Sequence, residues 1–166
     1  GMGIDIEHVN SPESYKTTRD EFNAGIKTLL PRARQVAGNS YPIASIPVSP
    51  LHMDLSPSSW QGFPWTTLGR YTDVVMPMAY WPTYCARFSS EPSGECPRGY
   101  AEENVTRSRA LTGLPVHPVG GVGDRITTDE LDRFVTGARA GRMIGCSIYD
   151  YRTTKVAFWE PLRRCS

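Results

Sequence analysis

Near the start of the chain stands Gly3-Ile4-Asp5-Ile6-Glu7, an apolar strand pattern that carries two carboxylates. Side chains at positions i and i+2 of a strand share one face, so Asp5 and Glu7 are expected side by side. Two ionised carboxylates at short range repel each other, which raises the pKa of one of them. A pair of carboxyl groups with separated pKa values is suited to glycosidic bond cleavage. The stretch therefore predicts a strand and a candidate acid-base site.

Outward from this stretch, strand patterns and helix patterns alternate. Further strands are expected at 41–48, 73–80, 115–119 and 143–149. Helices are expected from Ser11 to Gly38, over about 99–111, from Thr127 to Gly141, and around Trp159, and long loops are expected after the strand at 41–48 and from Trp81 to Cys96. Apolar residues recur at helical spacing in the first helix (Phe22, Ile26, Leu29, Ala33 and Val36) and in the third (Leu131, Phe134, Val135 and Ala138). Thr127 and Glu130 predict a capping box. Strands that alternate with helices in this way predict βα units and a parallel sheet. Prolines at 42, 47, 77, 115 and 118 are unusual in central strands, and Pro31 should kink or split its helix.

The residues at the strand ends favour a barrel over an open sheet. Besides the first carboxylates, these ends carry Tyr80, Trp81, Asp124, Tyr149 and Asp150. In a TIM barrel the active site lies at the carboxyl ends of the strands. Such a barrel has eight strands in about 250 residues, whereas this chain has 166 residues. We therefore predict one α/β domain over residues 1–166, an incomplete (β/α)8 TIM barrel with strands 4 to 8. A missing N-terminal half or another copy of the chain would cover its two open edges.

Charge and hydropathy exclude several classes of partner. With 18 Lys and Arg against 17 Asp and Glu, the formal net charge is +1. The basic residues are scattered along the chain, which argues against a nucleic-acid partner. No apolar run reaches the roughly 20 residues that span a bilayer. No cofactor or metal is expected, because the chain has no Cys-x-x-Cys pair and its histidines, His8, His52 and His117, do not cluster. The motif His52-Met53-Asp54 is weak evidence for metal ligands.

The four cysteines bear on the compartment. Cys85 and Cys96 flank a loop rich in Ser, Pro, Gly and Glu, which a local disulfide would order. Cys146 lies in an apolar run and is expected to be a small buried residue rather than a nucleophile. Its pairing with Cys165 stays open. A disulfide between Cys85 and Cys96 would indicate a secreted or cell-surface protein.

Two strand ends and the closing segment carry a family resemblance. The stretch 3–7 resembles the end of the fourth-strand motif of glycoside hydrolase family 18, the chitinase-like enzymes. Met78-Ala79-Tyr80 resembles that family's sixth-strand Met-x-Tyr element, and two βα units separate the two motifs. The segment 145–151 together with Trp159 is similar to uncharacterised secreted bacterial barrels related to glycosidases. The chain departs from the family at Gly3 and at Trp81, where the family has acids.

The resemblance implies an enzyme that acts on a carbohydrate. Glu7 would protonate the glycosidic oxygen, and Asp5 would turn toward it and stabilise the intermediate. Tyr80 would hydrogen-bond a substrate carbonyl or the attacking group. In family 18 the N-acetyl group of the sugar is the nucleophile, so no second protein carboxylate is required. Among the other strand-end residues, Trp81 would stack on a sugar, and Asp124, Tyr149 and Asp150 would also bind the substrate.

The same residues also have structural readings. Asp5 and Glu7 would then cap a helix or bridge to an arginine, and Tyr80 would be a core tyrosine. Trp81 is expected to be exposed at the start of a loop, where it would stack on a sugar or plug the barrel mouth. Asp150 would cap the final helix.

Two other functions remain open. A non-catalytic sugar-binding or surface protein can use the same scaffold as an enzyme. A phosphate-binding metabolic barrel is the second, because Gly120-Gly121 stands where such barrels cradle a phosphate on backbone N–H groups. Asp124 would repel a phosphate there, so a tight turn is the favoured role of the two glycines.

Overall fold

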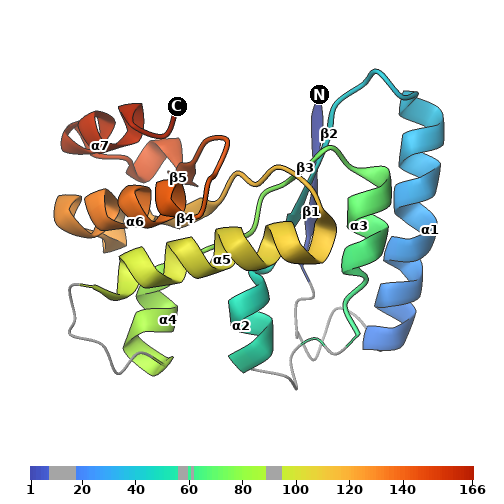
Figure 1. Ribbon diagram of the computed structural model, residues 1–166, viewed down its shortest axis with the longest axis horizontal. Helices are drawn as coiled ribbons and strands as arrows, with labels where there is room; N and C mark the ends of the chain where they lie inside the picture. The colour runs from blue at the N-terminus through green and yellow to red at the C-terminus, as the bar shows by residue number, and fades with distance from the viewer. Residues whose placement is uncertain (8–17, 56–59, 61, 89–94) are drawn as a thin grey trace.

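The computed structural model describes residues 1–7, 18–55, 60, 62–88 and 95–166 (Figure 1). The strands are β1 (Met2–Ile6), β2 (Ile43–Pro47), β3 (Val74–Val75), β4 (Val119–Val122) and β5 (Ser147–Tyr149). The α-helices are α1 (Arg19–Ala37), α2 (Pro50–Leu55), α3 (Trp65–Tyr71), α4 (Trp81–Phe88), α5 (Cys96–Thr112), α6 (Thr128–Ala140) and α7 (Trp159–Arg163). Short 3-10 helices are η1 (Gly123–Arg125), η2 (Tyr151–Thr153) and η3 (Val156–Phe158).

The described strands form two small parallel sheets. One has the order β1-β2-β3, and the other pairs β4 with β5. The register of the first sheet runs from Met2 opposite Ile43 to Ile6 opposite Pro47. Isolated parallel bridges, among them Met78 to Val119, connect the third segment with the fourth. The five strand segments therefore lie beside one another in chain order.

The predicted incomplete TIM barrel is wrong. The chain is a mixed helix and strand protein with sheets of three and two strands, in place of five long barrel strands. The expected strand over 73–80 is reduced to β3, and the strand expected at 115–119 begins only at Val119. Segments expected to be loops form the helices α2, α3 and α4. Coverage of the outer edges of β1 and β5 by a second copy stays a prediction.

Five prolines explain why the strands are short. Proline has no backbone N–H, so it cannot donate to a strand ladder. The five proline carbonyls nevertheless each accept a hydrogen bond from another strand segment. The pairs are Met2 N to Pro42 O (3.0 Å), Met78 N to Pro47 O (2.9 Å), Val119 N to Pro77 O (3.0 Å), Val75 N to Pro115 O (3.1 Å) and Ser147 N to Pro118 O (3.2 Å). The segments thus stay adjacent without forming a continuous ladder.

Helix α1 begins and ends on clear local signals. Thr18 and Glu21 form a capping box at its N-terminus, and Gly38 caps its C-terminus with φ 77°. The predicted end at Gly38 is confirmed. The predicted start at Ser11-Pro12-Glu13 lies outside the described residues.

The interior of α1 differs from the pattern expected of it. The helix is not split at Pro31. The carbonyl that loses its donor there belongs to Lys27, an exposed residue, so water can hydrogen-bond it. Leu29 and Val36, expected on the apolar stripe, are 54% and 76% exposed. The buried stripe is therefore narrower than the spacing indicated.

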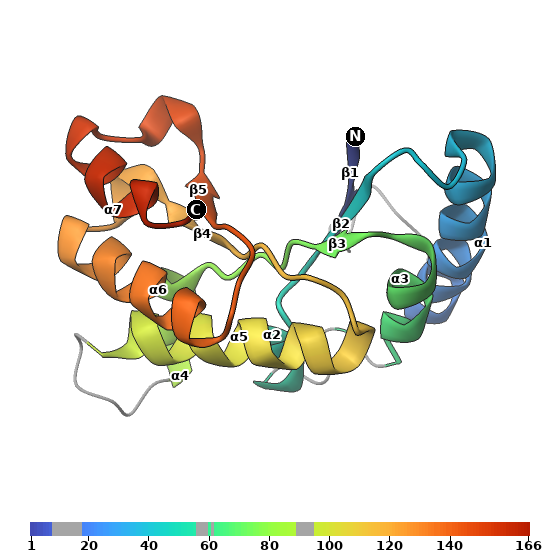
Figure 2. The same ribbon diagram turned by 45° about the horizontal axis from the view of Figure 1, so that its top comes forward.

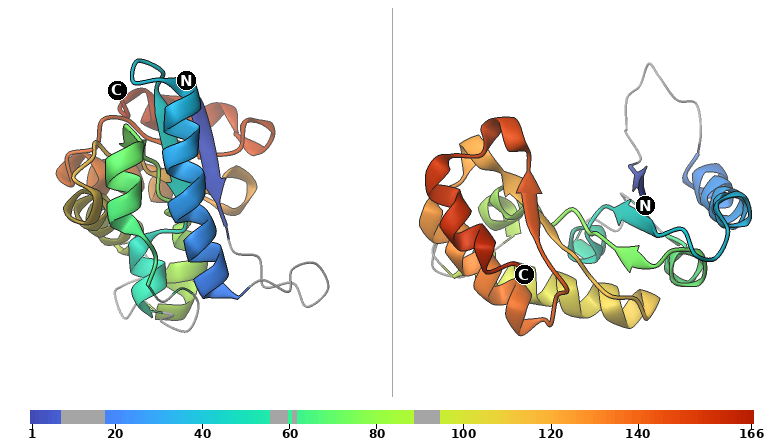
Figure 3. Two further views of the ribbon diagram at one scale, coloured as in Figure 1. Left: turned by 90° about the vertical axis from the view of Figure 1, so that its right-hand side faces the viewer. Right: turned by 90° about the horizontal axis from the view of Figure 1, so that it is seen from above.

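Helix α5 is the central helix, and it packs against α2, α3, α4 and α6. Figures 1 and 2 show it running across the molecule between the region of α3 and that of α6. Helices α1 and α3 lie side by side at one end (Figure 3, left). On α6 the predicted capping box of Thr127 and Glu130 is confirmed. Its predicted apolar face is confirmed as buried; it consists of Leu131, Phe134, Val135 and Ala138.

Two hydrophobic clusters stabilise the fold. The larger lies around α5 and α6, where the Trp81 ring stacks on Phe134 with centroids 4.8 Å apart. The smaller lies between the first sheet and α1 and includes Ile6 and Ile26. Trp65 packs against both clusters. The two clusters are therefore in contact through this one ring.

Both possible disulfides are present. The predicted bond between Cys85 and Cys96 is confirmed, and it joins α4 to the first residue of α5. Cys146 is bonded to Cys165, so it is half of a disulfide rather than an isolated buried thiol. The described cysteines are all paired.

The close contact between α5 and α6 generates a stability prediction. A Cβ on Gly137 would stand 2.0 Å from the carbonyl oxygen of Arg98, so no side chain fits. Gly137→Ala should therefore lower the free energy of unfolding by about 3 kcal/mol, as expected for overpacking against backbone. Urea denaturation followed by circular dichroism measures the change.

Gly25→Ala is the matched control within α1. A Cβ there meets nothing within 4 Å. Alanine should raise the free energy of unfolding by about 0.5–1 kcal/mol, because glycine is the poorer helix former. Equal effects of the two substitutions would contradict the close contact at Gly137.

Candidate functional site

Asp5 and Glu7 lie on one face at the end of β1. Both residues are exposed, whereas Ile6 between them is 3% exposed and packs in the smaller cluster. This alternation confirms the strand expected for the stretch. The carboxylates face away from the hydrophobic layer and toward solvent.

Tyr80 lies close enough to both carboxylates for their charges to shift its pKa. Burial, followed by the charges of Glu7, Asp5 and Tyr149 in that order of effect, raises the pKa of the Tyr80 phenol to about 12. Tyr80 comes from the segment between β3 and α4, and Tyr149 is the last residue of β5. Their ring centroids are 6.3 Å apart, with the planes tilted by 51°. The fold thus brings together Asp5, Glu7, Tyr80 and Tyr149, which we call the acid-tyrosine site.

Glu7 is the acid of this site. Partial burial raises the pKa of its carboxyl group, and the neighbouring charge of Asp5 raises it further. A raised pKa retains the proton to higher pH, which a general acid requires. The Tyr80 phenol stays protonated throughout the neutral range and can donate a hydrogen bond. The site therefore combines two carboxylates, one of them with a raised pKa, and a phenol that can donate a hydrogen bond.

Trp81 does not belong to this site. Its side chain is 0% exposed and lies in the core against Phe134, so the predictions of an exposed residue and of sugar stacking are wrong. The physical reason is that α4 begins at Trp81. The helix turns the indole toward α6, where its apolar area is removed from water.

The two predicted aspartates have different settings. Asp150 caps η2, since its Oδ1 accepts the backbone N–H of Thr153 at 3.0 Å. Asp150 therefore has the capping role expected of it, but it caps η2 and not the final helix. Asp124 is exposed in η1, and η1 packs against η2. Substrate binding by the two aspartates stays a prediction.

Gly120 and Gly121 are buried packing positions. A Cβ on Gly120 would lie 2.7 Å from the Trp81 ring, and one on Gly121 would lie 3.1 Å from Pro82. Both glycines thus make room for α4. The geometry explains the two glycines without a phosphate.

The structure also pairs charged residues that the sequence pattern did not reveal. Arg34 donates to Asp73 at 2.6 Å, and the carboxylate of Asp73 accepts the N–H of Ile43 at 2.7 Å. These bonds hold the pKa of Asp73 below its usual value. Asp54, considered with His52 as a metal ligand, forms an ion pair with Arg107. Within the described ranges, no group of three or more His, Cys, Asp or Glu side chains could hold a metal ion.

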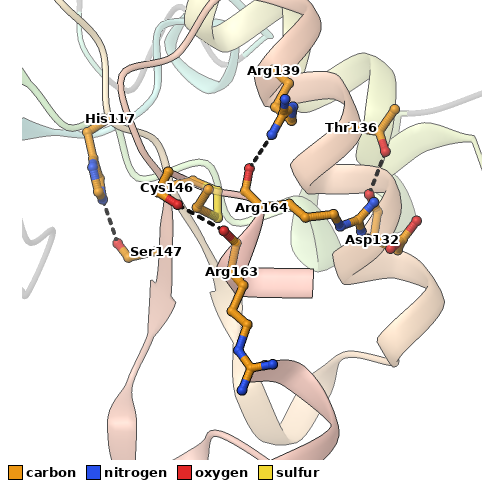
Figure 4. The surroundings of a disulfide bond; sticks show 10 residues. His117, Asp132, Thr136, Arg139, Cys146, Ser147, Arg163 and Arg164 are labelled. Carbon is orange, nitrogen blue, oxygen red and sulfur yellow. Dashed lines mark hydrogen bonds and ion pairs between the residues drawn. A yellow bond between two sulfur atoms is a disulfide. The ribbon is translucent and has the colours of Figure 1, made fainter. Parts of the chain in front are cut away.

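A further pair links the segment before β4 to β5. The Nε2 atom of His117 and the hydroxyl of Ser147 are 3.2 Å apart (Figure 4). Burial lowers the pKa of His117, which favours the neutral imidazole. No sequence spacing pointed to this contact, because 30 residues separate its members.

No protein-family model, curated protein or solved structure matches this chain. The function is therefore argued from the site.

Glu7 and Asp73, two of the carboxylates with a shifted pKa, give opposite pH predictions. The pKa of Glu7 is raised by folding, so the folded state binds more protons and loses stability as the pH rises. Glu7→Gln removes this penalty. Relative to the native protein, the variant should gain stability between pH 3 and pH 7, measured by urea denaturation.

Asp73→Asn is the control of opposite sign. The lowered pKa of Asp73 stabilises the folded state above the unfolded pKa, and this stability is lost as the pH falls. The variant should therefore be most destabilised at neutral pH and least at low pH. The same pH trend in both variants would contradict the opposite pKa shifts described for Glu7 and Asp73.

Proposed function

We propose that this protein hydrolyses a glycosidic bond in a polysaccharide or amino-sugar glycan, with Glu7 as general acid. The observation that carries the proposal is the raised pKa of Glu7 beside Asp5 and Tyr80. Paired carboxyl groups with different settings are the usual means of cleaving glycosides. Two tyrosine rings at the same place add aromatic surface for a sugar.

Each member of the site has a role in this reaction. Glu7 gives its proton to the glycosidic oxygen as the bond to the anomeric carbon breaks. Asp5 stabilises the positive charge that develops on the sugar. The phenol of Tyr80 donates a hydrogen bond to a substrate carbonyl or to the attacking group. The resemblance to family 18 implies that the nucleophile is the N-acetyl oxygen of the substrate, which attacks the anomeric carbon.

A non-catalytic sugar-binding protein is the second candidate. The observation that favours it is the exposure of both Asp5 and Glu7, because catalytic carboxylates are usually shielded from water. Such a protein would use the same site to hold a glycan without cleaving it.

We further propose that the protein is exported. Two disulfides persist best in an oxidising compartment, and a polysaccharide substrate is met outside the cell. None of the described helices is long and apolar enough to cross a membrane.

Glu7→Gln tests the catalytic proposal. The amide keeps the shape of the side chain but has no proton to give, so hydrolysis should fall by about 10²–10⁴-fold. The release of reducing ends from a β-1,4-linked N-acetylglucosamine hexamer measures turnover, and calorimetry measures binding of the same hexamer. Binding should survive in the variant.

Asp129→Asn is the matched control. Asp129 is an exposed carboxylate of α6 paired with Arg133, and such surface pairs contribute little. Its turnover should equal that of the native protein. Unchanged turnover in Glu7→Gln would refute the role of Glu7, and binding without any turnover in the native protein would favour the second candidate.

A further inference from the structure

A cavity lies beside β5, and none of the acid-tyrosine site residues lines it. Its volume is about 510 Å³, within the range of small-ligand pockets. Residues from β5, η2 and α7 line it, among them Ser147, Ile148, Tyr151, Thr154, Trp159 and Arg163. We call it the β5 cleft.

The lining residues of the cleft belong to one loop, which the second disulfide closes. Its lining residues all fall within the range from Cys146 to Arg163, which is part of the loop closed by the disulfide from Cys146 to Cys165. Figure 4 shows this bond between the start of β5 and the end of α7. Arg139 donates to the carbonyl of Arg164 at 2.8 Å and so ties the end of α7 to α6. The walls are thus cross-linked before any ligand arrives, which lowers the entropy cost of binding.

Two aromatic rings of the cleft face solvent. Tyr151 is 81% exposed and Trp159 is 44% exposed, and their ring centroids are 6.3 Å apart. Trp60 and Trp81, in contrast, are 6% and 0% exposed. Exposed aromatic rings that lie next to each other beside a cavity are typical of a binding surface. The pair therefore marks the cleft as a ligand site.

The polar groups of the cleft suit hydroxyl groups. Arg163 forms one ion pair with Glu160 at 3.0 Å, and its guanidinium has more N–H donors than this bond uses. The guanidinium donor of Arg163 and the carboxylate acceptor of Glu160 thus lie next to each other. The hydroxyl of Thr154 donates to the carbonyl of Asp150 at 2.7 Å, so its oxygen is oriented as an acceptor. Neighbouring hydroxyls of a sugar offer the complementary pattern.

We propose that the β5 cleft binds a carbohydrate chain, with sugar rings against Trp159 and Tyr151. The sugar class rests on the proposed function and on the lining of the cleft, where two exposed aromatic rings lie beside a hydroxyl group and a guanidinium group.

Acrylamide quenching of tryptophan fluorescence tests the proposal. Trp159 is the most exposed of the four tryptophans, so it should dominate the quenched signal. The N-acetylglucosamine hexamer should protect the native protein from quenching, and cellohexaose serves as a second probe. Tyr151→Ala should weaken this protection about tenfold in apparent affinity, and Trp159→Phe should remove the signal.

Tyr41→Ala is the matched control, because Tyr41 is also an exposed tyrosine, at 43%. Protection should be unchanged in it. No protection by either sugar at millimolar concentration would overturn the proposal, as would equal affinity in Tyr151→Ala and the native protein. Protection by an extended peptide alone would overturn it in favour of a protein partner.

The two proposals fail separately. Glu7→Gln should keep the protection by the hexamer, since Glu7 is not part of the cleft. Tyr151→Ala should keep turnover of a nitrophenyl N-acetylglucosamine dimer that is too short to reach both sites. Loss of the proposed catalysis with intact protection would leave the cleft as a binding site alone.

Discussion

The hydrogen bond from a strand N–H to a proline carbonyl is the constraint on which the rest of this structure depends. Each such proline supplies an acceptor and no donor, so neighbouring segments are held side by side by fewer bonds than a regular ladder has. The result is two short sheets joined by isolated bridges, such as that between Val75 and Val116. This sparse ladder still aligns the segment ends. It is what brings Tyr80 and Tyr149 together with the carboxylates of β1.

Because the strands contribute few bonds, the helices provide most of the tertiary contacts. Helix α5 contacts four other helices, and it approaches α6 so closely that Gly137 meets the carbonyl of Arg98. The stacked rings of Trp81 and Phe134 fill the core beside this contact. The apolar residues are thereby concentrated in two clusters against the helices, whereas Asp5 and Glu7 at the end of β1 stay exposed.

The acid-tyrosine site and the β5 cleft are built in different ways. In the first, burial and neighbouring charge act on groups from three distant segments, and Glu7 holds its proton more tightly as a result. In the second, consecutive short elements within one disulfide loop supply all the lining residues, including Tyr151 and Trp159. Both use residues of β5, since Tyr149 contributes to one and Ile148 to the other.

Local features were predictable from the sequence because they depend on residues close together in the chain. The capping box of Thr127 and Glu130, the strand carrying Asp5 and the disulfide across 11 residues are of this kind. The barrel was not a sound prediction, because the alternation of strands and helices does not reveal how many ladder bonds the prolines remove. The position of Trp81 was also decided by tertiary structure, since only the packing of α4 against α6 turns its ring into the core. The placement of Tyr80 and Tyr149 near Glu7 was also decided by tertiary structure. The pKa of Glu7 is raised mainly by burial, which only the folded chain provides, and then by the charge of Asp5 two residues away.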